Sequence, residues 1–134
     1  MGRQSLLRLL LDTHAILWWL FDDPALGGEV RRLIELSTTR VMVSSASGWE
    51  IATKHRLGKL PEAEDAVLRL PELLRRSDFD VLPVGMDHAL EAGRLPGPHR
   101  DPFDRMLIAQ ARIEGVPVAT IDPVFSAYGV DVLW

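Results

Sequence analysis

The sequence of 134 residues contains no cysteine and no long uninterrupted hydrophobic run. Without cysteine there can be no disulfide framework and no thiolate chemistry, so any metal must be held by oxygen or imidazole ligands. The most apolar stretch, LLRLLLDTHAILWWLF, is interrupted by Arg8, Asp12 and His14, which argues against a membrane span and against the core of a signal peptide. We therefore expect a soluble protein of the reducing cytoplasm.

An excess of positive charge is also missing. The chain has 15 Lys and Arg residues against 19 Asp and Glu residues, and its formal net charge is −4. Passive coating of nucleic acid depends on clustered Lys and Arg, so the charge balance argues against that class of protein. It does not exclude a nuclease, because acidic side chains gathered around cations make the formal charge overstate the negative charge of the site.

Length and composition fit one domain over residues 1–134, with 47% hydrophobic residues to form a core. Short β-rich runs alternate with helical patterns, and the early runs are continuously apolar, as in strands covered on both faces. This order predicts a three-layer α/β/α sandwich with a central parallel sheet of about five strands. The expected strands lie within residues 8–13, 40–45, 79–84, 117–122 and 130–134.

Helices are expected over residues 24–37, 62–77, 87–95 and 101–115. The second should be bent or broken at Pro71, because proline removes a helical hydrogen bond. The last begins with DPFD, in which Asp101 is the expected N-cap and Asp104 the third helical residue, and it ends at a C-cap glycine, Gly115.

Four acidic residues stand at or near predicted strand-to-helix transitions. They are Asp12 after the first strand, Glu50 paired with Ser47 in an expected capping box, Asp104, and Asp122 before an expected first helical residue, Pro123. Each one alone is explained as a helix cap. In a parallel sheet, however, these transitions share the carboxyl edge, where open α/β folds bind ligands. Such a cluster calls for a hard divalent cation, Mg²⁺ or Mn²⁺.

The segments LLLDTHAILWWL, SGWEIATKHRLGKL, HRDPFDRMLIAQA and ATIDPVF together resemble the PIN domain, and most closely the VapC-type toxin ribonucleases of bacterial toxin–antitoxin pairs. The resemblance implies a Mg²⁺- or Mn²⁺-dependent endoribonuclease that cleaves RNA. Its metal-binding acids fall on Asp12, Glu50, Asp104 and Asp122. The implied partners are RNA, a cognate VapB-like antitoxin and a second copy of the chain in a homodimer.

Several further residues are candidates for supporting roles. We expect Asp101 to cap its helix and to add negative charge near the metal, and Thr120 to bond a ligating carboxylate or water. Trp18 and Trp19 point in different directions on one helix, which predicts an exposed aromatic surface for a partner. Candidate contacts to phosphate are Lys54, His55, Arg56, Lys59, Arg100 and Arg105.

Three alternatives stay open from the residues alone. A phosphatase would use Asp12 as its nucleophile, but such enzymes usually have a second Asp two positions later, where His14 stands here. A receiver domain needs an acidic pair at the first strand and a late lysine, and no lysine follows Lys59. A non-catalytic α/β binding module would use the acids only as caps. Capture of beryllofluoride would support the first two, and metal-dependent RNA cleavage would support the nuclease.

Overall fold

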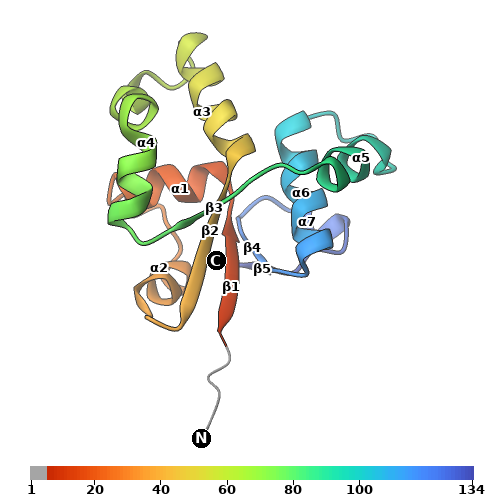
Figure 1. Cartoon of the computed structure of the whole chain (residues 1–134), viewed down its shortest axis with the longest axis horizontal. Helices are drawn as coiled ribbons and strands as arrows, with labels where there is room; N and C mark the ends of the chain where they lie inside the picture. Colours follow the sequence, from red (N-terminus) through yellow and green to blue (C-terminus); the bar gives the residue numbers. More distant parts are fainter. Residues whose placement is uncertain (1–5) are drawn as a thin grey trace, which may run out of the picture.

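The computed structural model describes residues 6–134 and is built around a five-stranded sheet whose neighbouring strands are all parallel (Figure 1). The strand order is β3-β2-β1-β4-β5. The strands are β1 (Leu7–Leu11), β2 (Thr39–Ser44), β3 (Asp80–Leu82), β4 (Val118–Ala119) and β5 (Val132–Leu133). The predicted parallel α/β architecture is confirmed, although β3, β4 and β5 are shorter than their β-rich sequence runs.

Helices cover both faces of the sheet, which lies between them in Figure 1. On one side are α1 (Thr13–Leu20), α2 (Gly28–Glu35) and α4 (Glu64–Arg76), whereas α3 (Ser45–Arg56) continues beyond the end of β2 and packs against α4 and the 3₁₀ turn η1 (Pro61–Ala63). On the other side are α5 (Met86–Arg94), α6 (Pro102–Glu114) and α7 (Val124–Ala127). Within residues 6–134, no helix is both long and apolar enough to cross a membrane.

The central strand β1 serves two hydrophobic cores at once. Leu9 and Leu11 are fully buried with residues of α1, α2 and α4, whereas Leu10 is fully buried with residues of α5, α6 and α7. Successive side chains of a strand point to opposite faces, so a strand covered on both sides has to be continuously apolar. This explains the leucine run 9–11 in β1.

The register of the sheet brings the ends of β1 and β4 together. Leu11 pairs with Ala119, and the Asp12 amide donates to the Ala119 carbonyl at 3.1 Å. Figure 1 shows that α1, α3 and α6 all start at the end of the molecule where β1 ends. Strands β1 and β4 are therefore neighbours, which brings Asp12 and the residues after Ala119 to the same edge.

Helix α4 runs through Pro71, so the expected break at this residue is wrong, whereas the expected bend stays a prediction. Its flanking residues Leu70 and Leu74 pack into the core between the helices and the sheet. Tertiary packing of an apolar helix face outweighs the one hydrogen bond that proline removes.

Candidate active site

Asp12 links the end of β1 to the start of α1. It is the N-cap of this helix, and its Oδ1 accepts a hydrogen bond from the Ala15 amide at 2.8 Å. Its side chain is buried, at 8% exposure, because the adjoining strands and helices enclose the sheet edge. The cap bond fixes one carboxylate oxygen.

Glu50 reaches the same edge from the second turn of α3. The expected capping box of Ser47 and Glu50 is wrong, because β2 continues directly into α3 and the cap is Ser44, whose Oγ accepts from the Ala46 amide. Ser47 therefore lies inside the helix and is buried. Because the helix starts earlier, the Glu50 carboxylate does not cap it.

Asp104 and Asp101 separate at the start of α6 as the sequence predicts. Asp101 is the N-cap, and its Oδ1 accepts from the amides of Phe103 and Asp104 at 2.9 and 3.2 Å. Asp104 makes a contact that the sequence did not indicate: its Oδ2 lies 3.0 Å from His99 Nε2. Gly115 ends the helix with φ of 67°, which confirms the C-cap.

Asp122 follows β4 through a short turn. Its amide donates to Thr120 Oγ1 at 3.0 Å, and its Oδ1 accepts from the Val124 amide. Helix α7 begins at Val124, one residue later than expected, with Pro123 as the N-cap residue. The Thr120 side chain also acts on Asp12, whose pKa it lowers.

All of the predicted acids line one cavity of about 460 Å³. Its lining is Asp12, Thr13, His14, Trp18, Glu50, Lys54, Asp101, Asp104, Ile121 and Asp122. We call this space the acid cavity. Five carboxyl groups from four separate segments of the chain thus meet at the carboxyl edge of the sheet.

Burial and mutual repulsion work against the charged carboxylates of the acid cavity. Burial raises the pKa of Asp12 above its ordinary value, and the charge of Glu50 adds to this rise, whereas the hydrogen bonds of Thr120 and Ala15 oppose it. Burial likewise raises the pKa of Asp104, with contributions from neighbouring acids and an opposing hydrogen bond from His99. A bound cation would offset these costs.

The donor set fits a hard divalent cation. It offers carboxylate oxygens, which Mg²⁺ and Mn²⁺ prefer, and Mg²⁺ typically uses one or two carboxylates and keeps several waters. Between residues 6 and 134, no three Asp, Glu or His side chains form a ready-made cage around one ion. Two of the acids are held by protein partners instead, Glu50 by Thr13 and Lys54, and Asp104 by His99.

Sequence reasoning missed Thr13 as a site residue and saw Lys54 only as a phosphate contact. The Thr13 hydroxyl donates to Glu50 Oε1, and the Lys54 ammonium donates to Glu50 Oε2, each at 2.5 Å. Burial lowers the pKa of Lys54, but the hydrogen bond and charge of Glu50 and the charges of Asp101 and Asp104 outweigh it, so the pKa is raised. The spacing of Glu50 and Lys54, four residues on a helix, was the available signal.

Arg105 has other partners than the expected phosphate. Its guanidinium donates to the carbonyls of Ala92 and His99 at 3.1 and 3.0 Å and also to the carbonyl of Leu95. These carbonyls belong to α5 and to the segment that leads to α6. Arg105 therefore fastens that segment to α6.

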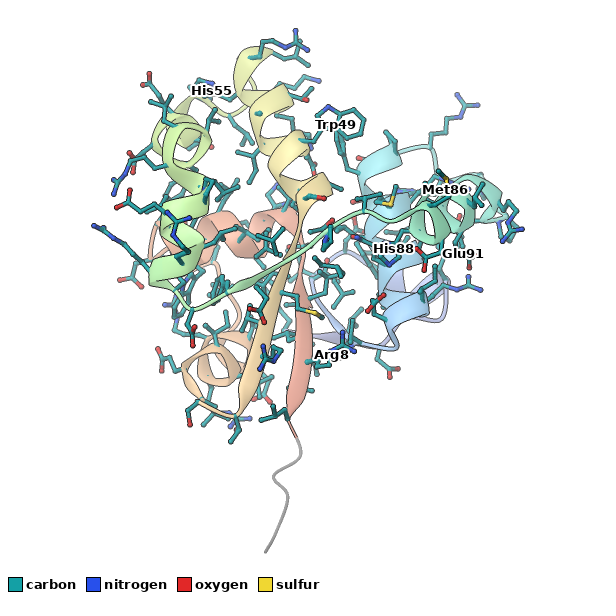
Figure 2. The ribbon with its side chains drawn as sticks, in the orientation of Figure 1. Arg8, Trp49, His55, Met86, His88 and Glu91 are labelled. Atoms are coloured by element: carbon teal, nitrogen blue, oxygen red, sulfur yellow. The ribbon has the colours of Figure 1, made fainter. Side chains whose placement is uncertain are left out.

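Phe21, at the end of the first helix, is 41% exposed, but the expected exposed aromatic surface does not extend over Trp18 and Trp19. Both rings are half-buried, Trp18 against His14 and Trp134, and Trp19 against Phe79. The exposed tryptophan is Trp49, at 62%, which Figure 2 shows on α3 facing the start of α6. The rings of the first helix are covered by chain segments far away in sequence, which the pattern of one helix cannot show.

The profile of the PIN domain family matches residues 9–131. The chain belongs to the PIN domain family. Ribonuclease VapC16 of Mycobacterium tuberculosis is 38% identical to this PIN domain over 66 residues, which are 49% of this chain and 45% of that protein. The match thus spans less than half the length of that curated relative.

Solved structures agree with this PIN fold. VapBC2 from Rickettsia felis, bound to a DNA fragment from the promoter, has a TM-score of 0.71 at 15% identity, covering 95% of this chain and 98% of that one. VapC20 of M. tuberculosis, a sarcin-ricin loop cleaving toxin, has a TM-score of 0.66 at 20% identity, covering 91% and 95%. At such identities the likeness supports the fold alone.

Proposed function

We propose that this PIN domain is a metal-dependent endoribonuclease that acts as the toxin of a toxin–antitoxin pair and hydrolyses RNA phosphodiester bonds. The observation that supports this most strongly is the meeting of Asp12, Glu50, Asp104 and Asp122 in one acid cavity. The partial match to Ribonuclease VapC16 supports the same activity.

In this proposal Asp12, Glu50, Asp104 and Asp122 hold Mg²⁺ or Mn²⁺. When bound, the ion would supply Lewis-acid chemistry, activating a water and stabilising the charge on the phosphate. The chain's own residues orient the ligands: Thr13 holds Glu50, and the Ala15 amide holds Asp12. Asp101 fixes the first turn of α6 and so the place of Asp104.

The proposed partners follow from the relatives. VapBC2 is bound to a DNA fragment from its promoter, and VapC20 is a sarcin-ricin loop cleaving toxin. By analogy, we propose that this chain binds an RNA substrate, a VapB-like antitoxin and a second copy of itself in a homodimer.

The deciding experiment is RNA cleavage by the full chain after treatment with a chelator. Wild type should cleave only after Mg²⁺ or Mn²⁺ is added, and Asp12→Asn should stay inactive at the same metal concentration. Cleavage by Asp12→Asn at the wild-type rate would contradict the assignment. Capture of beryllofluoride on Asp12, without RNA cleavage by wild type, would favour the phosphatase instead.

A further inference from the structure

The acid cavity already contains one cation that belongs to the chain. Lys54 Nζ lies 2.5 Å from Glu50 Oε2, with the Lys54 side chain 30% exposed and the Glu50 side chain 6% exposed. Only two of the fifteen basic residues are lysines, Lys54 and Lys59. Lys59 is exposed beyond the end of α3 and does not line the cavity.

The chemistry of the lysine side chain suits this position. An ammonium is a compact point charge, whereas a guanidinium is a broad planar fork that favours bidentate carboxylate pairs. Lysine is fully charged at neutral pH. It therefore places one positive charge among carboxylates that would otherwise repel one another.

Each oxygen of the Glu50 carboxylate already has one hydrogen-bond partner in this arrangement. Thr13 occupies Oε1 and Lys54 occupies Oε2. A metal ion that coordinates Oε2 has to displace the ammonium, since two cations cannot share one oxygen at contact distance without strong repulsion. Lys54 can withdraw, because its flexible stem already leaves part of it in solvent.

We propose that Lys54 is an internal counter-ion, which compensates the acid cavity in the metal-free protein and competes with the divalent cation for the Glu50 carboxylate. The proposal rests on the proposed function, because it assumes that a cation binds among these carboxylates. As a consequence, Lys54 stabilises the metal-free protein and lowers its affinity for the metal.

The first test compares Mn²⁺ affinities by titration calorimetry, with Mn²⁺ chloride added to the chelator-treated full chain. Lys54→Met should bind Mn²⁺ more tightly than wild type, by at least about fivefold if the coupling has the usual size for two ligands of one protein. Lys59→Met removes the same charge outside the cavity and should match wild type. Equal or weaker Mn²⁺ binding by Lys54→Met overturns the proposal.

Thermal denaturation separates competition from a merely structural role. Without metal, Lys54→Met should melt below wild type, and Mn²⁺ should raise its melting temperature by more than it raises that of wild type. Equal Mn²⁺-induced shifts would contradict competition. Lys54→Gln serves as the second variant if the methionine variant does not fold.

A measurement on wild type needs no variant. With ¹³C-lysine labelling only two lysine Cε signals arise, and adding Mg²⁺ should shift the Lys54 signal and leave that of Lys59 in place. An unmoved Lys54 signal at saturating Mg²⁺ overturns the competition while leaving metal binding intact. If neither wild type nor Lys54→Met binds Mn²⁺ or Mg²⁺, the proposed function itself fails.

Discussion

The Thr13 hydroxyl donates a hydrogen bond to Glu50 Oε1 at 2.5 Å and thereby joins the first residue of α1 to the second turn of α3. Both side chains are buried, and Ser47 Oγ lies 3.1 Å from the same hydroxyl. The segment after β1 thus positions two acids of the cavity. Asp12 is held as the N-cap of α1, and Glu50 is held by the hydroxyl of Thr13.

Thr13→Val should destabilise the protein by about 1–3 kcal/mol, because it leaves a buried carboxylate oxygen without its donor. Thr13→Ser keeps the hydroxyl and should retain most of the stability. Urea denaturation of both variants gives the comparison. Equal midpoints for the valine and serine variants would show that the hydrogen bond contributes nothing.

Asp12→Asn should raise the melting temperature of the metal-free protein at neutral pH. The pKa of Asp12 is raised from the ordinary 3.8 in the folded state, so folded protein binds this proton more tightly than unfolded protein. Stability then falls as pH rises from about 3.8 through the raised pKa, and the whole penalty is present above it. Asparagine removes the charge and can still cap α1.

The pH dependence of this gain is the measurement. The difference in melting temperature between Asp12→Asn and wild type should be largest near pH 7 and vanish as pH falls toward 4. A pH-independent difference would refute the electrostatic cause. The rate of RNA cleavage by the variant should fall at least about 100-fold. Substituting a residue that only supports a metal ligand already lowers metal affinity or activity by about 10–100-fold, and Asp12 is a proposed ligand.

Asp101 and Asp104 should separate by function. Asp101→Ala should lose about 0.5–2 kcal/mol of stability, and Asp101→Ser should recover much of it, because serine also caps helices. Asp104→Asn should abolish cleavage with little loss of stability. Denaturation curves and cleavage rates at saturating Mg²⁺ test both. A stable Asp101→Ser as inactive as Asp104→Asn would make Asp101 a fifth working acid.

Arg105→Met should destabilise the protein by about 1.5–3 kcal/mol, the range for hydrogen bonds of a charged group, because three carbonyls lose their donor. Arg100→Met is the matched control, since Arg100 is exposed on the neighbouring segment. Equal denaturation midpoints for the two variants would refute the fastening role of Arg105.

Local signals were enough to predict the parts of the site that depend on neighbours in sequence. The leucine run of β1 and the turn into α1 predicted the place of Asp12, and the Asp-Pro start of α6 predicted the cap at Asp101. The parallel order of the sheet then placed the acids at one edge. The roles of these acids in binding metal stay predictions.

Long-range contacts were beyond the reach of such signals. The partners of Arg105 come from a different helix and the segment after it, and the Thr13–Glu50 bond spans 37 residues. Trp18 is covered by Trp134, from the other end of the chain. The start of α3 was misjudged for a local reason, because Ser44 and Ser47 are both good caps and only the length of β2 decides between them.

The direct passage from β2 into α3 makes the spacing between the strand and Glu50 intolerant of insertions and deletions. No loop lies between Ser44, the last strand residue, and Ser45, the first helical one. One added residue in the first turn of α3 would rotate Glu50 by about 100° around the helix axis and away from Thr13 and the cavity. The segment 95–100 before α6 is held by Arg105 through the Leu95 and His99 carbonyls, but it is a loop, and lengthening a loop costs little free energy. Variation in length among active chains of this fold should therefore accumulate before α6 and be absent between Ser44 and Glu50.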